Sequence, residues 1–273
     1  MRRSSLVVLL LLAGCSGATS PEATVISAAG GVNEAILGYE SQRDQPVLLA
    51  TRGVVDVHVE TFAGSVRVEA DPSVKESVVM VRRIGTHGWG RTDESMHSLG
   101  EIRSVVGLDR VEGVDTITVK ASTEHPEPYF QNTEITIKVP DLGAVFIRTS
   151  RGDVWVQDNR GPLDVTTTRG AIRAMTPWRM DQPMTLVTSD GDVDLRLRGE
   201  SKGWINAETV NGTIKSRVKH GKFLATDSVN DIDSLRAWLN DGTNPITLRT
   251  SNADVIISVV PDPVSSNPFA PMP

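Results

Sequence analysis

Cysteine, aromatic side chains and long apolar runs are scarce in this 273-residue chain, and each scarcity excludes a class of protein. A single cysteine leaves no disulfide framework. The 28 Lys and Arg residues are outnumbered by 34 Asp and Glu, so the chain lacks the basic excess that nucleic-acid phosphates attract. Hydrophobic residues at 39% argue against intrinsic disorder. The sequence therefore indicates a folded, acidic protein with no nucleic-acid partner.

The apolar segment near the amino terminus has the features of an export signal. Arg2 and Arg3 precede the apolar run 6–13, which rises about 12 Å as a helix and is too short for the roughly 30 Å core of a bilayer. The tetrad that ends at Cys15, LAGC, resembles the bacterial lipobox, in which the signal is cleaved before a cysteine that carries diacylglycerol. The alternative is ordinary signal-peptidase cleavage, with Cys15 incidental.

Lipidation at Cys15 makes the membrane a partner of the protein, since two or three acyl chains anchor a protein stably. We therefore expect an exported, lipid-anchored envelope protein. Ser16 follows the cysteine where an aspartate would favour retention at the inner membrane, and by analogy this favours the outer membrane in a Gram-negative host.

We expect four segments along the chain. Residues 1–14 form the signal peptide and residues 15–44 a lipidated, flexible tether. Residues 45–260 form the folded domain, with a polar insertion at 84–113. The proline-rich stretch 261–273 is expected to be an irregular, disordered tail.

A repeated turn dominates the folded part. Apolar residues alternate with polar ones, then a threonine is followed three positions later by glycine, and the alternation resumes, as in Thr149 to Gly152 and Thr188 to Gly191. The turn position is occupied by Gly64, Gly152, Gly170, Gly191, Gly212 and Asn230, with Ala253 as an exception. Successive turns from Gly152 onward lie 18 to 23 residues apart, a period that indicates a solenoid.

The alternation predicts which side chains fill the interior of this solenoid. The inward columns are expected to contain Val145, Ile147, Val154, Val156, Leu163, Val165, Ile172, Met184, Leu186, Val193, Leu195, Ile205, Ala207, Ile214, Phe223, Ala225, Ile232, Ile246, Leu248, Val255 and Ile257. Glycine is expected in the turn because a tight arc favours positive φ. The threonine hydroxyl is expected to bond a turn amide.

The fold class is therefore all-β: a single-stranded β-helix with rungs of about 20 residues, preceded by a small antiparallel region. Alternating segments at 77–82, 115–121 and 133–139 are expected to form that region, which begins or caps the solenoid. A short helix in the insertion is expected to be lined by Met96, Leu99, Ile102 and Val106.

The segment ITIKVPDLGAVFIRTSRGDVWVQDNRGPLDVTTTRGAIRA and the rungs after it resemble the DUF4097 family of β-strand repeat proteins, proposed to be adhesins. The resemblance covers roughly residues 50–258. It implies a β-helix-like domain at the bacterial envelope, often beside envelope-stress or regulatory proteins, and it brings no catalytic residues.

Outward side chains supply the candidate ligand surface. Trp155 is expected to face outward at the start of a column of alternating charge that continues through Arg173, Asp194, Lys215, Asp233 and Ile256. Trp178 and Trp238 each fall eight residues after a turn, on the third side of the coil. The three tryptophans are a possible platform for sugars or protein surfaces; the alternative is that they cover loops.

Three aspartates, Asp190, Asp192 and Asp194, raise two sharper alternatives. As a calcium site they lack the nine-residue, glycine-rich period of calcium-binding β-rolls. As catalytic carboxylates, with Arg173, Arg196 and Arg198 nearby, they would make the protein a polysaccharide lyase or hydrolase. The five histidines show no metal-ligand spacing.

The sequence thus predicts an envelope-anchored lipoprotein with a non-catalytic β-solenoid for binding, adhesion or scaffolding. No catalytic residue, cofactor or metal is expected, and the candidate partner besides the membrane is a glycan or an envelope protein. The alternatives are the polysaccharide-cleaving enzyme and an accessory sensor of envelope stress. The sequence sets no oligomeric state.

Overall fold

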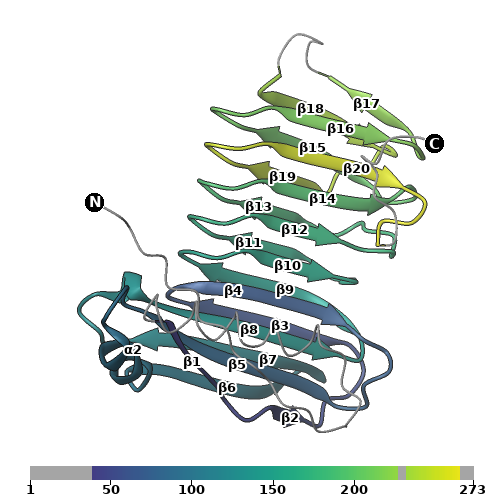
Figure 1. Ribbon diagram of the computed structural model, residues 1–273. Coiled ribbons are helices and arrows are strands. Elements are labelled where there is room, and N and C mark those ends of the chain that lie inside the picture. Colours follow the sequence, from purple (N-terminus) through teal and green to yellow (C-terminus); the bar gives the residue numbers. More distant parts are fainter. Residues whose placement is uncertain (1–38, 227–231, 265–273) are drawn as a thin grey trace, which may run out of the picture.

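The computed structural model describes residues 39–226 and 232–264 (Figure 1). The export signal, Cys15, the turn at Asn230 and most of the proline-rich tail lie outside the described residues. The regular secondary structure of the described chain is almost all β-strand, and its one α-helix, α2 (Thr92–Leu99), is too short to cross a bilayer.

The strands of the wide, amino-terminal end of the molecule are β1 (Tyr39–Arg43), β2 (Val47–Leu49), β3 (Val55–Thr61), β4 (Gly64–Ala70), β5 (Ser77–Thr86), β6 (Ile102–Val111), β7 (Val114–Thr123) and β8 (Gln131–Val139). The strands of the narrow stack above it are β9 (Leu142–Thr149), β10 (Val154–Gln157), β11 (Leu163–Thr166), β12 (Ile172–Met175), β13 (Met184–Val187), β14 (Val193–Arg198), β15 (Gly203–Glu208), β16 (Ile214–Val218), β17 (Phe223–Ala225), β18 (Ser234–Leu239), β19 (Pro245–Arg249) and β20 (Val255–Val260). A 3₁₀ turn, η1, covers Pro128–Phe130.

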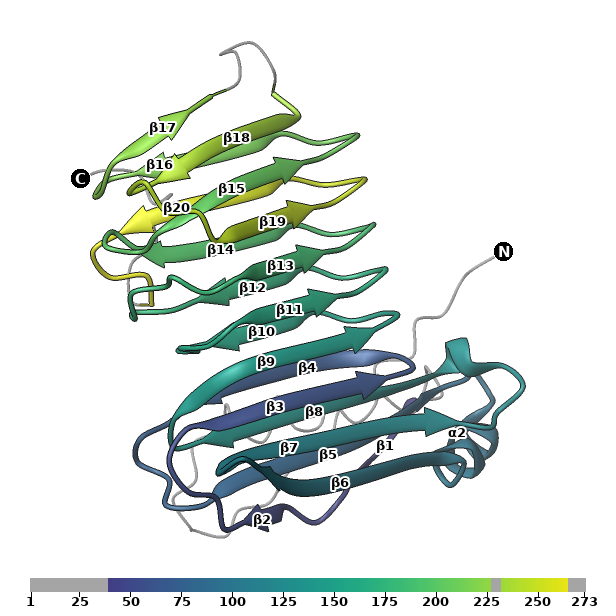
Figure 2. The same cartoon turned by 180° about the vertical axis from the view of Figure 1, so that it is seen from behind.

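The strands form two sheets that face each other, and each rung of the stack gives one strand to each sheet (Figures 1 and 2). The first sheet has the order β1-β5-β8-β4-β10-β12-β14-β20-β16, with β2 on β5. The second sheet has the order β17-β18-β15-β19-β13-β11-β9-β3-β7-β6. Strands of successive rungs pair in parallel, which confirms the all-β solenoid.

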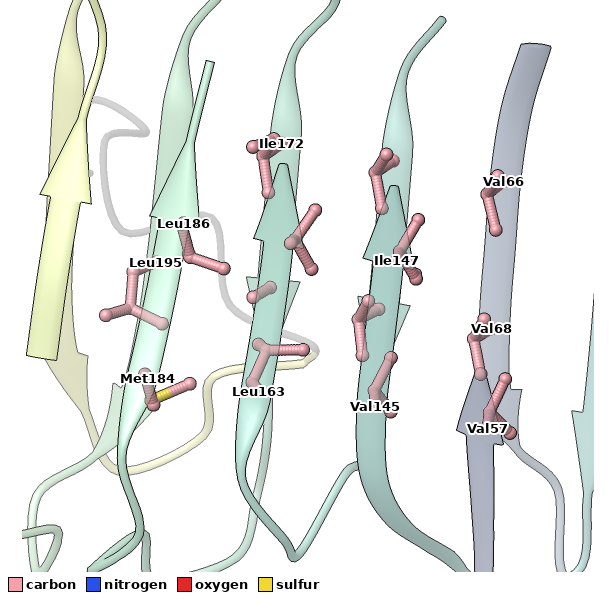
Figure 3. Packing of buried hydrophobic residues seen from close by; sticks show 14 of the residues in the cluster. Val57, Val66, Val68, Val145, Ile147, Leu163, Ile172, Met184, Leu186 and Leu195 are labelled. Carbon is pink, nitrogen blue, oxygen red and sulfur yellow. The ribbon is translucent and has the colours of Figure 1, made fainter. Parts of the chain in front are cut away.

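The interior is a set of stacked aliphatic columns (Figure 3). Val57, Ile147 and Leu163 come from the second sheet and Val66 and Ile172 from the first, and each is at most 2% exposed. Alternate residues of each short strand point into the gap between the sheets, so branched side chains fill it. The expected inward positions are buried through most of the stack.

The order of the rungs departs from the order of the sequence near the top of the stack. The last rung, β19 and β20, lies between the rung of β13 and β14 and the rung of β15 and β16 (Figure 2). The prediction of a further parallel rung after β16 is wrong. Strands β17 and β18 form an antiparallel hairpin that pairs with β15. Ala225 is exposed and Ile232 is 66% exposed, so neither is an inward residue.

The amino-terminal end also differs from expectation in two respects. The folded part begins before residue 45, because β1 pairs antiparallel with β5. The segment 84–113 is not only a polar insertion, since β6 pairs with β7 along its whole length and extends the second sheet. Antiparallel β5 and β6 thus close this end, while β7 and β8 form a parallel rung beneath β3 and β4.

The helix in that insertion is shorter than expected. Leu99 is buried in α2, but Met96 is 51% exposed. Ile102 and Val106 belong to β6 rather than to the helix. The helix ends after two turns because Gly100 follows it and β6 then pairs with β7.

Glycine is required in the turns chiefly because adjacent rungs approach closely. Gly152, Gly170 and Gly191 have φ of 113°, 143° and 150°, and a Cβ on Gly191 would lie 2.2 Å from the carbonyl oxygen of Gly170. Gly212 lacks a positive φ, so the expected conformational reason is wrong there, yet its Cβ would meet the Ala253 carbonyl oxygen at 1.8 Å. Close approach excludes a side chain at both kinds of turn.

The threonines of the turns connect neighbouring rungs. The hydroxyl of Thr188 donates to the carbonyl oxygen of Gly170 at 3.0 Å, and that of Thr250 donates to Gly191 at 2.9 Å. The expectation of a bond to a turn amide was therefore wrong in its partner. A buried hydroxyl that bonds a carbonyl of the adjacent rung satisfies both groups and fixes the register of the stack.

Candidate functional site

Trp155 faces outward on the first sheet, as the alternation predicts, but its neighbours cover it. Arg67 on β4 and Arg173 on β12 flank it in register, with their guanidinium carbons 5.0 and 5.2 Å from the ring centroid. A shallow hollow of about 230 Å³ runs from Trp155 past Arg173 to Asp194 and Ile256. Trp155 is thus the centre of a cation–π stack rather than a bare platform.

The expected column of alternating charge is wrong beyond Asp194. Ile256 lies next to Asp194 in the sheet, and Lys215 follows Ile256, because β20 is inserted before β16. Asp233 lies outside this column, just before β18. Lys215 instead forms an ion pair with Asp254.

The three aspartates of the alternative catalytic or metal site have separate structural partners. Asp194 is 5% exposed and accepts from Arg173 at 3.0 Å and Arg196 at 2.8 Å. Asp192 accepts the backbone N–H of Asp254 at 3.0 Å, a bond between rungs, and Asp190 accepts from the Asn252 side chain. Within residues 39–226 and 232–264, no three His, Cys, Asp or Glu side chains are placed to hold a metal ion. The carboxylates serve the stack.

Trp178 and Trp238 lie apart from Trp155 and from each other. Trp178 is in the loop after β12, 41% exposed, with the guanidinium carbon of Arg160 3.7 Å from its ring centroid. Trp238 is on β18 of the second sheet, 38% exposed, and its ring centroid is 4.4 Å from that of Trp204. The structure therefore does not bring the three tryptophans to one surface.

The second sheet carries an outward apolar row that these sequence expectations omit. Each of β11, β13 and β19 has a proline at its start, Pro162, Pro183 and Pro245, directly before the first inward residue. Strand register places these prolines side by side and continues the row to Trp204 and Trp238. The recurring proline at one position of the repeat was the signal in the sequence.

A hollow of about 430 Å³ opens on the same face, over β3, β9, β11 and β13. Phe146 lies in it, with the His58 ring 4.4 Å away on β3. Arg148 covers the Phe146 ring at 4.2 Å and donates two hydrogen bonds, of 2.9 and 2.7 Å, to the carboxylate of Asp164. This hollow is larger than the one at Trp155. Within it Arg148 neutralises Asp164, whereas Asp56 accepts the backbone N–H of Ala144 at 2.8 Å.

Comparison with known proteins identifies the carboxyl-terminal part of the chain. Residues 130–258 match the sequence profile of the Toastrack DUF4097 family. This region belongs to the Toastrack DUF4097 family. The Toastrack region runs from the 3₁₀ turn before β8 into β20, and so includes the whole lining of the hollow at Trp155 and part of that at Phe146.

Solved structures with the same architecture include a proposed cell adhesion protein from Clostridium sporogenes, with a TM-score of 0.54 and 10% identity over 81% of this chain and 100% of that one. That likeness concerns the fold alone. A proposed adhesin from Bacteroides fragilis aligns over 81% of this chain and 97% of its own, at 9% identity and a TM-score of 0.27.

Among curated proteins, Protein kinase C-like 1 of Saccharomyces cerevisiae is 27% identical over 158 residues, 54% of this chain. The chain spans 13% of the length of that kinase.

A buried histidine lies before the Toastrack region, in the wide end of the molecule. His87 is 3% exposed, and neither ring nitrogen has a hydrogen-bond partner among the described residues. Its ring lies 4.8 Å from Phe130 and 5.2 Å from His125. Burial lowers the pKa of His87, and the neighbouring His125 and Arg91 lower it further, against the opposite effect of Glu94 and Glu127. The neutral form of His87 is therefore favoured.

Proposed function

We propose that the protein is a lipid-anchored, non-catalytic binding protein of the bacterial envelope, in which the Toastrack solenoid presents its outer faces for adhesion or scaffolding. The observation that carries the proposal is the use of the outward carboxylates. Asp192 accepts a backbone N–H of the adjacent rung and Asp194 is enclosed by two guanidinium groups, so both carboxylates have structural partners. Outward aromatic and proline side chains remain for recognition.

Two further observations support an envelope location and an adhesive role. The lipobox-like tetrad at Cys15 gives the chain a means of attachment, and the structural neighbour from Clostridium sporogenes is itself described as a proposed cell adhesion protein. Parallel rungs closed by antiparallel strands at both ends make a rigid body that a tether can hold away from a membrane.

The test has two arms, attachment and binding. Globomycin treatment and Cys15→Ala should each block maturation of the precursor. The washed membrane fraction should then contain no processed form of the Cys15→Ala chain. Beads coated with the mature chain should bind whole cells or isolated envelopes more than beads coated with albumin. Normal maturation in both treatments overturns the anchor, and no binding above albumin overturns the adhesive role.

A further inference from the structure

The apolar row on the second sheet is continuous over six strands. Pro162, Pro183 and Pro245 are exposed, Trp204 is half-buried, and Trp238 and Leu224 follow on the antiparallel hairpin. Their order comes from strand register: Leu163 pairs with Met184, Met184 with Ile246, Trp204 with Pro245 and Trp238, and Leu224 with Trp238. We call these six residues the proline–tryptophan stripe.

The stripe is long and narrow. Neighbouring strands lie about 4.8 Å apart, so six strands in register extend about 24 Å from β11 to β17. Figure 2 shows these strands following one another up the stack, from β11 through β13, β19, β15 and β18 to β17. One side chain per strand gives a track, which suits a chain-like ligand better than a compact one.

A polar row runs beside the stripe, two residues further along each strand. It contains Asp164, Thr185, Thr247 and Asn206 in register on β11, β13, β19 and β15. Hydroxyl and amide groups donate hydrogen bonds to a polyhydroxyl ligand and accept them from it, and a carboxylate accepts them. The Oδ1 atom of Asn206 has no hydrogen-bond partner among the described residues.

The charge of this track favours an uncharged ligand. No member of the stripe is ionisable, and the carboxylate of Asp164 in the polar row is already bound by Arg148. Anions would find no uncommitted cation between β11 and β15 in either row, and cations would compete with Arg148. An acyl chain is excluded by the open face, because it requires enclosure rather than a track one side chain wide.

We infer that the proline–tryptophan stripe and the polar row beside it bind a linear, neutral polysaccharide that lies across the strands. The apolar faces of its sugar rings pack on the prolines and tryptophans, and its hydroxyl groups bond Asp164, Thr185, Thr247 and Asn206. The hollow at Phe146 receives one end of the bound segment. The inference rests on the proposed binding function and specifies its ligand and its surface.

The chain offers a matched pair of tryptophans for the test. Trp238 lies on the stripe and is 38% exposed, whereas Trp178 lies in the loop after β12 and is 41% exposed. The full mature chain carrying Cys15→Ser, and the same chain with Trp238→Ser, Trp178→Ser or Pro183→Asp added, are run in native gels that contain hydroxyethyl cellulose, glucomannan or dextran. Hyaluronan provides the acidic comparison. Circular dichroism and urea unfolding confirm that each variant is folded.

At least one neutral polysaccharide should retard the parent chain, and Trp238→Ser and Pro183→Asp should each weaken that binding about tenfold or more. Trp178→Ser should bind within twofold of the parent. Should Trp238→Ser fail to fold, Pro183→Asp against Trp178→Ser gives the same comparison. Neutral oligosaccharides should bind more tightly as their length approaches that of the stripe.

Three outcomes overturn the inference: no retardation by any neutral polysaccharide, retardation by hyaluronan alone, or equal weakening by Trp178→Ser and Trp238→Ser. Coated beads separate the inference from the proposed function. If beads coated with the parent chain and beads coated with Trp238→Ser bind envelopes equally, the adhesive role stands and the stripe has no part in it. If neither kind of bead binds envelopes, both the adhesive role and the inference are overturned.

Discussion

Replacing the turn glycines tests the physical basis of the stack, because two different constraints act there. A Cβ on Gly191 meets both a positive φ, 150°, and the backbone of the adjacent rung, 2.2 Å away. The chain contains a glycine for each constraint alone. Gly113 has a positive φ of 86° with nothing within 4 Å, Gly212 has the 1.8 Å contact without a positive φ, and Gly107 in β6 has neither.

The expected costs of the four Gly→Ala substitutions follow from these constraints. At Gly107 alanine should be neutral or stabilising by up to about 1 kcal/mol, since glycine in a strand interior is entropically unfavourable. At Gly113 a left-handed alanine should cost about 1 to 2 kcal/mol. At Gly212 overpacking against backbone should cost about 1 to 3 kcal/mol. At Gly191 both apply, which gives about 2 to 5 kcal/mol, a large part of a typical stability of about 5 to 15 kcal/mol.

Urea unfolding followed by tryptophan fluorescence measures the four variants against the parent chain. The Gly107→Ala variant should have the highest urea midpoint and Gly191→Ala the lowest. The midpoints of Gly113→Ala and Gly212→Ala should lie together between these two. A Gly191→Ala midpoint equal to that of Gly107→Ala would refute the close-contact explanation of the repeat. A Gly212→Ala midpoint equal to that of Gly107→Ala would show that the neighbouring turn yields without cost.

Three further predictions concern buried polar groups. Burial and the neighbouring His125 and Arg91 lower the pKa of His87 in the folded state, so the contribution of neutral His87 to stability is complete above about pH 6.5 and is lost as the pH falls toward the folded pKa. The urea midpoint should therefore drop between pH 7.5 and 5, and His87→Leu should make that drop smaller. An equal drop in the variant would contradict this role of His87. Thr188→Val removes the bond between rungs at 3.0 Å and should cost about 1 to 3 kcal/mol by urea unfolding, and no loss would mean that the hydroxyl has no structural role. Asp194→Asn leaves two guanidinium groups without their carboxylate and should lower the melting temperature in low salt, which an unchanged scan would rule out.

The repeat itself could be predicted from the sequence because its signals are local. Alternating apolar residues, the turn glycines and the threonine three positions earlier each report on one rung, and Val145, Leu163 and Met184 are buried as the alternation predicts. The resemblance to the DUF4097 family rested on the same residues, and the match over residues 130–258 confirms it.

The order of the rungs could not be predicted in the same way. Leu248 on the last rung pairs with Leu186 and Ala207, and any of these aliphatic residues fits against any other, so the alternation carries no information about which rung lies next to which. The inserted position of β19 and β20 depends on contacts between residues about 40 and about 60 positions apart. This insertion changes the surface beside Trp155, because Ile256 and not Lys215 lies beside Asp194.

The tryptophans show a second limit of the sequence. Trp155 faces outward as expected, but the arginines that flank it belong to β4 and β12, and only the pairing of those strands reveals them. The spacing predicts Trp238 on a third side of the coil, whereas the antiparallel hairpin places it beside Trp204 on the second sheet. The proline row was visible in the sequence, and its meaning depended on that placement.

The proposed function requires this solenoid to bind its ligand without cleaving it. The most direct measurement incubates the mature chain with purified envelope polysaccharide and determines, by size-exclusion chromatography, both the bound fraction and the chain length of the polysaccharide. The proposed function predicts bound polymer of unchanged length, with the same result for Asp192→Asn. Shortened polymer whose formation is lost in Asp192→Asn would contradict it.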